Sequence, residues 1–139
     1  MTVPETVRAR VRDQAQDRCG YCQIEGQYVY APMEIDHITP RTLGGTDDEE
    51  NLWLACPRCN GFKGSQTYGI DPEIGQRVQL FNPRQQKWPS HFRWGEDQAT
   101  IIGLTVCGRA TVHALQLNFE PNRELRRLFV QAGWYPPVD

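Results

Sequence analysis

Cys19-Gly-Tyr-Cys22 and Cys56-Pro-Arg-Cys59 are the two stretches that decide how this chain folds. Each Cys-x-x-Cys turn lets two sulfurs reach one ion, and two such turns complete the tetrahedral shell that zinc requires. Cys56 lies 34 positions beyond Cys22, a longer separation than that of a simple zinc ribbon. The spacing therefore predicts a structural Zn²⁺ site that encloses a further structural element.

The start of the chain predicts that the cysteine thiols stay reduced. Met1-Thr-Val-Pro-Glu5 has no basic stretch leading into an apolar one, so we expect no secretory signal and a cytoplasmic location. Thiols stay reduced there, which favours zinc over disulfides. Cys107, the fifth cysteine, lies far from both pairs and is interpreted as a small buried apolar residue. No apolar run approaches the ~18–20 residues of a membrane span, so no membrane partner is expected.

Length and charge restrict the possibilities further. The 139 residues fit one domain, or a small domain with an extension. A net charge of −2 counts against a protein that holds nucleic acid mainly through its overall field. Arginines nevertheless cluster near both ends of the chain: Arg8, Arg10, Arg12 and Arg18, then Arg123, Arg126 and Arg127. These clusters could form a local basic face, or equally a helix face that water solvates.

The first half of the chain predicts a helix, two strands and a second helix. Apolar residues recur every fourth position within about residues 4–17, as on one face of a helix. Residues 27–30 and 33–38 favour β-structure and suit a short antiparallel pair. In the second of these strands, Ile35 and His37 alternate with Asp36, so the imidazole and the carboxylate would point apart in a regular strand. We expect the strand to end or twist at Asp36-His37. A short helix is expected to begin at Pro57.

The second half carries no metal-ligand spacing. Residues 78–81, 91–94 and 100–104 read as strands, with turn residues between them. Residues 111–117 and 123–132 are expected to be helical. Together the two halves predict an α+β protein.

Three quoted segments resemble the HNH endonucleases, members of the ββα-metal nuclease class: Glu34-Ile-Asp-His-Ile-Thr-Pro40, Leu43-Gly-Gly-Thr-Asp-Asp-Glu-Glu-Asn-Leu52 and Cys56-Pro-Arg-Cys-Asn-Gly-Phe-Lys63. The resemblance covers about residues 19–65. It implies two strands and a helix around one divalent ion, braced by a zinc that two cysteine knuckles hold. We therefore expect an HNH core over residues 1–67, with its N-terminal helix and knuckles. Residues 68–139 would form a C-terminal extension of short antiparallel strands and helices packed on that core.

The resemblance also assigns roles. His37 stands at the first letter of the motif, Asn51 at the second and Asn60 at the third, where family members carry histidine or asparagine. A histidine ordinarily titrates near neutral pH, so His37 is expected to be the general base that activates water. Asp36 and the Asn60 amide oxygen are hard ligands suited to Mg²⁺ or Mn²⁺. Asn51 is expected to fix the loop and orient His37.

Other interpretations stay open for several residues. Asn51 could stabilise a turn, and Asn60 could cap the helix after Cys59. Lys63 and Arg41 are candidate contacts to substrate phosphate, with a solvent-facing lysine as the alternative for Lys63.

The leading hypothesis is a metal-dependent endonuclease that hydrolyses phosphodiester bonds in DNA, with nucleic acid as its partner. The alternatives are a zinc-stabilised nucleic-acid-binding module without cleavage and an RNA-directed nuclease. The sequence indicates neither the target sequence nor the oligomeric state.

Overall fold

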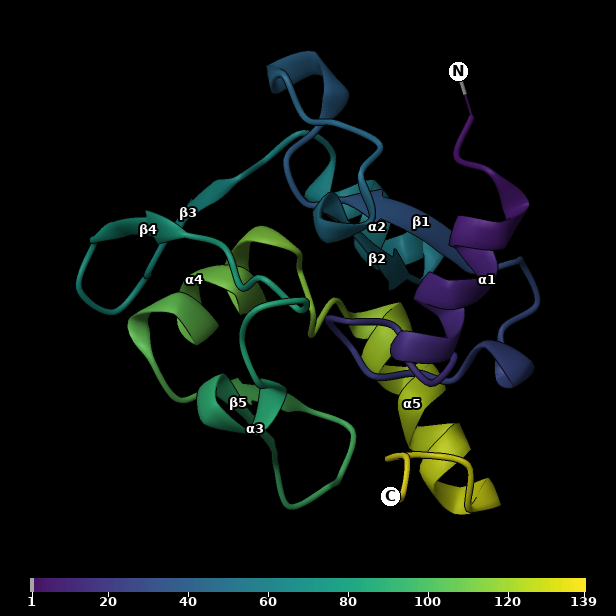
Figure 1. Cartoon of the computed structure of the whole chain (residues 1–139). Coiled ribbons are helices and arrows are strands. Elements are labelled where there is room, and N and C mark those ends of the chain that lie inside the picture. Colours follow the sequence, from purple (N-terminus) through teal and green to yellow (C-terminus); the bar gives the residue numbers. More distant parts are fainter. Residues whose placement is uncertain (1) are drawn as a thin grey trace.

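The computed structural model describes residues 2–139 and contains helices and short antiparallel strands. This mixture confirms the predicted α+β class. None of its helices, within these residues, is long and apolar enough to cross a membrane. The helices and strands follow one another in this order (Figure 1): α1 (Glu5–Gln14), β1 (Glu34–His37), β2 (Leu52–Ala55), α2 (Pro57–Lys63), β3 (Tyr68–Ile70), β4 (Arg77–Gln79), α3 (Trp88–His91), β5 (Phe92–Trp94), β6 (Ile101–Gly103), α4 (Val106–Ala114) and α5 (Glu120–Ala132).

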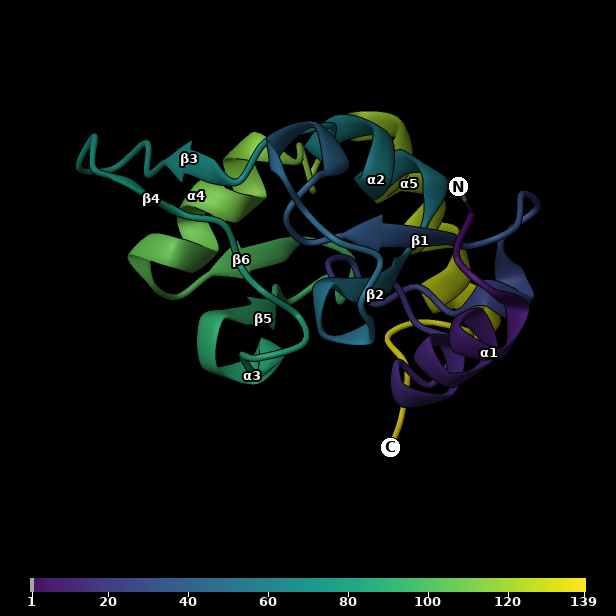
Figure 2. The same cartoon turned by 45° about the horizontal axis from the view of Figure 1, so that its top comes forward.

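The β1–β2 pair is the centre of the N-terminal half, with α1 on one side and α2 on the other (Figure 2). Ile35 pairs with Leu54 and His37 with Leu52, so these side chains share one face because strand residues alternate. Ile35, Leu52 and Leu54 pack with Val11 of α1 in one apolar cluster. β1 ends at His37, as predicted, and α2 begins at Pro57 as expected.

The predicted partner of β1 is wrong. Residues 27–30 do not form a strand; Gly26–Tyr28 is a 3₁₀ turn, and β1 pairs with β2 instead. The Tyr28 ring stacks on Trp134 with centroids 4.7 Å apart, while Tyr30 is fully exposed. β-Propensity reflects fit to a half-buried surface, and here the buried surface that β1 needs comes from Leu52 and Leu54.

Two antiparallel hairpins, β3–β4 and β5–β6, and the helices α3, α4 and α5 form the C-terminal half. The β3–β4 hairpin projects beside α4 in both views. The predictions missed β3 and α3 and placed the helix at 111–117 too late, because α4 spans Val106–Ala114. Thr105 starts it by accepting a hydrogen bond from the Gly108 amide, as N-cap threonines do. α5 covers the helix predicted at 123–132 and begins three residues earlier.

The largest apolar cluster contains the cysteines of both pairs and residues from the C-terminal half. It is formed by Cys19, Tyr21, Cys22, Ile24, Ala55, Cys56, Cys59, Leu80, Phe81, Trp88, Phe92, Ile101, Leu115, Leu117, Phe129 and Tyr135. The Tyr135 hydroxyl donates to the Cys22 carbonyl at 2.7 Å, and the Trp88 indole N–H donates to the Tyr21 carbonyl at 2.8 Å. Side chains from beyond residue 67 thus hold the first knuckle in place. The boundary at residue 67 stays a prediction.

Candidate active site and cysteine centre

The four cysteines of the two pairs form one buried cluster. Their sulfurs all lie within 4.8 Å of one another. The first sulfur of each pair accepts a hydrogen bond from a backbone amide inside its own turn: Tyr21 N–H to Cys19 Sγ and Cys59 N–H to Cys56 Sγ, both at 3.4 Å. Such amide donors favour a thiolate.

The charge balance of this cluster suits a cation. Burial raises the pKa of the Cys19 thiol, but its contacts with Cys22, Cys56 and Cys59 outweigh burial and bring that pKa well below its ordinary value. Contact with Cys19 in turn raises the pKa of Cys22 and of Cys59 well above the ordinary value. Several thiolates can therefore coexist here only with a counter-charge. The donor set is one that could hold a metal ion such as zinc.

Polar side chains of β1 and α2 meet on the side of the strand pair that faces away from α1. The Asn60 amide nitrogen donates to a Glu34 carboxylate oxygen at 2.7 Å, and Lys63 Nζ donates to Asp36 Oδ1 at 2.9 Å. Glu34 and Asp36 are two residues apart on a strand and so share a face. Asn60 and Lys63 are three apart on a helix and also share one. The structure thus brings Asp36 and Asn60 to facing surfaces of β1 and α2, each with a different partner.

Asp36 is buried and fully hydrogen-bonded, with 2% of its surface exposed. Its second oxygen accepts the Tyr21 hydroxyl at 2.5 Å. Burial, and then the negative charge of Asp36, raise the pKa of Tyr21 well above its ordinary value. Tyr21 therefore stays a hydrogen-bond donor to this carboxylate.

Lys63 is as buried as Asp36, at 2% exposure. Besides Asp36, its ammonium group donates to the carbonyl of His37 at 2.9 Å and to that of Ile38 at 3.4 Å. It thereby ties the end of β1 to α2. A contact between Lys63 and substrate phosphate would require it to leave these acceptors, and that role stays a prediction.

His37 lies apart from this ion pair and forms its own polar contact. Its Nε2 is 2.8 Å from Asp47 Oδ1, and its side chain is 18% exposed. Arg41 donates through Nε to Oδ1 and through Nη2 to Oδ2 of Asp47, both at 2.9 Å. The hydrogen bonds to His37 and then to Arg41 lower the pKa of Asp47. Arg41, predicted from the sequence as a contact to substrate phosphate, therefore binds the same carboxylate as His37, the predicted base.

Asn51 closes the loop between β1 and β2. Its side-chain oxygen accepts the Thr39 amide at 2.8 Å, and its side-chain nitrogen donates to the carbonyls of Thr39 at 2.9 Å and Thr46 at 2.8 Å. Asn51 does not bond to His37 itself in the described residues. It fixes the loop that carries Asp47, which does.

Sequence reasoning missed three polar residues of this region. Glu34 could have been found, because strand alternation places it on the face of Asp36. Tyr21 was hidden between two cysteines, and Asp47 was one of four consecutive acidic residues. No local pattern shows which member of that run turns toward His37.

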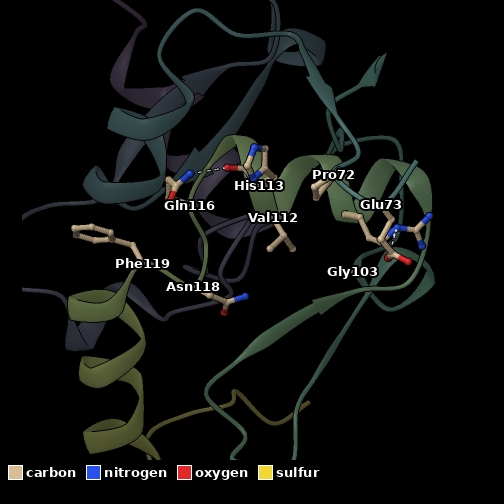
Figure 3. Close-up of a pocket in the computed structure, with 9 residues that line it drawn as sticks. Pro72, Glu73, Gly103, Val112, His113, Gln116, Asn118 and Phe119 are labelled. Atoms are coloured by element: carbon tan, nitrogen blue, oxygen red, sulfur yellow. Dashed lines mark hydrogen bonds and ion pairs between the residues drawn. The ribbon is translucent and has the colours of Figure 1, made fainter. Parts of the chain in front are cut away.

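A separate surface pocket of about 300 Å³ lies in the C-terminal half (Figure 3). Its lining residues fall between Pro72 and Phe119, so it contains none of the site residues predicted from the sequence. Gln116 donates to the His113 carbonyl at 3.0 Å, and Glu73 pairs with Arg109 at 2.8 Å. These polar groups already have partners within the chain.

Comparison with known proteins identifies the family of the segment that contains the cysteine turns and β1. The family described as HNH endonuclease matches residues 19–66. This segment is an HNH endonuclease domain. It contains both cysteine pairs, β1, β2 and α2, so the resemblance drawn from the motifs is confirmed.

Two curated relatives extend the comparison. Over 54 residues the chain is 39% identical to a CRISPR-associated endonuclease Cas9 of Corynebacterium diphtheriae, and the aligned region is 38% of this chain and 5% of that protein. Over 114 residues it is 24% identical to the Septu protein PtuB of Bacillus thuringiensis, covering 81% of this chain and 41% of that protein. The chain thus spans less than half the length of either relative. No solved structure matches it.

Proposed function

We propose that this protein is an endonuclease that hydrolyses phosphodiester bonds, with DNA as its substrate. The observation that carries the proposal is the position of His37 at the end of β1 inside a matched HNH domain, next in sequence to Asp36, whose side of β1 meets α2 and carries the oxygens of Glu34, Asp36 and Asn60. The name of one relative fits this proposal, since that protein is called an endonuclease. Phosphodiester hydrolysis needs a base for water and positive charge near the phosphoryl oxygens.

His37 is the proposed general base. A neutral imidazole at the end of a strand can accept a proton from water that attacks phosphorus. Asn51 would serve this step indirectly, because its three hydrogen bonds fix the loop that faces His37. Arg41, whose side chain is 47% exposed, would attract a phosphate near His37.

Asp36 and Asn60 are the proposed ligands of Mg²⁺ or Mn²⁺, which when bound would supply positive charge to the phosphoryl oxygens. Carboxylate and amide oxygens are the donors that such hard ions prefer, and the two residues lie on facing elements. Asp36 is bonded to Lys63 in this structure, so ion binding would require Asp36 to exchange partners. Glu34, which contacts Asn60, is a further oxygen donor within reach of the same face.

Zn²⁺ is the proposed occupant of the cysteine cluster, with a structural role. Cys19, Cys22, Cys56 and Cys59 supply four sulfurs and leave no position for substrate, which is typical of structural zinc sites. A reducing cytoplasm would keep these thiols available.

The Asp36–Lys63 ion pair favours a second candidate function, a zinc-stabilised module that binds nucleic acid without cutting it. If the ion pair persists in solution, Asp36 cannot hold a catalytic ion. RNA is the alternative substrate, because the proposed chemistry acts on a phosphate backbone that both polymers share.

One cleavage assay distinguishes these functions. Purified protein is incubated with labelled single-stranded DNA, duplex DNA and RNA, each with Mg²⁺ or Mn²⁺. We expect DNA cleavage, reduced at least ~10²-fold in His37→Ala because general-base catalysis contributes about 10²–10⁴-fold. His113→Ala is the matched control, since His113 is an exposed histidine on α4. Zinc content and thermal transition are measured for both variants.

The outcomes separate clearly. Cleavage by His37→Ala at the wild-type rate would refute His37 as the base. Salt-sensitive DNA retention without cleavage under either ion would favour the binding module, and cleavage confined to RNA would make this an RNA-directed nuclease.

A further inference from the structure

Asp47 forms a closed set of contacts with His37 and Arg41. One carboxylate oxygen, Oδ1, is 2.8 Å from His37 Nε2 and 2.9 Å from Arg41 Nε, while Oδ2 is 2.9 Å from Arg41 Nη2. The two Arg41 contacts make a bidentate pair, which fixes the plane of a carboxylate as well as its position. Asp47 therefore cannot rotate away from the imidazole without breaking both.

These contacts determine which nitrogen of His37 carries the hydrogen. An ionised carboxylate can only accept hydrogen bonds, so Nε2 must be the donor to Asp47. A neutral imidazole then carries its free lone pair on Nδ1. Among residues 2–139, no hydrogen bond engages His37 Nδ1, whereas Nε2 is engaged by Asp47. Nδ1 is therefore the nitrogen that can take a proton.

The position of Asp47 follows from the loop that carries it. Asn51 holds the backbone of Thr46, the residue before Asp47, and both backbone groups of Thr39, two residues after His37. The His37 and Asp47 ends of the loop are thus clamped together by one amide side chain. Asp48, the next residue, is exposed, and only Asp47 of this pair reaches the imidazole.

We propose that Asp47 is a positioning residue, which accepts the Nε2–H of His37 and so presents Nδ1 as the proton acceptor for the attacking water. This inference rests on the proposed function, in which His37 is the general base. Asp47 itself touches neither water nor phosphate in this scheme. Arg41 has a second task in it, which is to hold the Asp47 carboxylate in the plane that the imidazole needs.

The test compares Asp47→Asn with Asp48→Asn, which makes the same charge change on the neighbouring, exposed carboxylate. An asparagine at 47 can turn its amide N–H₂ toward Nε2 and select the other tautomer. We expect kcat to fall about 10–100-fold, the effect typical of residues that orient a functional histidine, with KM unchanged. Asp48→Asn should cleave at the wild-type rate.

A second readout does not depend on activity. Long-range ¹H–¹⁵N spectra of ¹⁵N-histidine-labelled protein, recorded at one mildly alkaline pH, distinguish the two imidazole tautomers. We expect His37 to be Nε2–H in the wild type and in Asp48→Asn, and to lose that preference in Asp47→Asn.

The outcomes keep the two proposals apart. If His37→Ala abolishes cleavage while Asp47→Asn retains the wild-type kcat and tautomer, the role of Asp47 is refuted and the nuclease proposal stands. If His37→Ala cleaves normally, the nuclease proposal fails in its choice of base, and the positioning role proposed for Asp47 falls with it.

Discussion

Replacing Lys63 by methionine should destabilise this protein strongly, because Lys63 is the counter-charge of a buried carboxylate. Lys63 and Asp36 are each 2% exposed, and Nζ is 2.9 Å from Oδ1. Methionine fills a similar volume but leaves Asp36 charged and without a cation, with only the Tyr21 hydroxyl as a donor. The carbonyls of His37 and Ile38 lose their ammonium donor at the same time.

The magnitude follows from the burial. Removing one partner of a buried ion pair costs about 3–5 kcal/mol, against a total of about 5–15 kcal/mol for a domain. At about 4 °C for each kcal/mol in a chain of this size, the midpoint of thermal unfolding should fall by about 12–20 °C. Urea unfolding, followed by far-ultraviolet circular dichroism with zinc present, measures the free-energy change directly.

Two further variants make the reasoning refutable. The double variant Asp36→Asn with Lys63→Met removes both charges and keeps an acceptor oxygen for Tyr21, so it should be at least about 2 kcal/mol more stable than Lys63→Met alone. Lys87→Met is the matched control: Lys87 is exposed, and its replacement should change stability by no more than about 0.5 kcal/mol. A loss below about 1 kcal/mol in Lys63→Met, or no recovery in the double variant, would show that the pair is not buried in solution.

Two other predictions concern the cysteine cluster and α2. Cys56→Ser should lower the amount of bound zinc, measured by mass spectrometry of metals. It should also remove most of the folded population, since zinc binding at such sites supplies folding free energy of about 10–16 kcal/mol. A stable, zinc-free variant would rule out the structural role. Gly61→Ala should stabilise the protein by about 0.5–1 kcal/mol in urea unfolding, because a Cβ at this helical position meets no atom within 4 Å; destabilisation would mean that α2 is packed more tightly than the structure shows.

The parts of the site that the sequence predicted well are those with short, regular spacing. Each cysteine turn is a local motif, and the buried cluster follows from its four sulfurs. The end of β1 at His37 and the start of α2 at Pro57 were likewise readable from residues next to one another.

The errors came from segments whose structure depends on distant partners. Residues 27–30 have strong β-propensity, yet Tyr28 packs against Trp134 and Phe129 from the other end of the chain. β3 consists of Tyr68–Ile70 and is defined by its pairing with β4. Such pairings cannot be seen in a window of neighbouring residues.

The amino-acid sequence by itself determined that four sulfurs converge and that a histidine terminates a strand between them. Tertiary structure alone decided which partner each polar group takes: Asp36 bonds to Lys63, 27 positions away, and His37 to Asp47, 10 positions away. The physical reason is that buried charges and imidazoles bind whichever complementary group the folded loops and packed helices bring within about 3 Å. The partner of each group therefore depends on which distant segments the folded chain brings together, and neighbouring residues do not encode this.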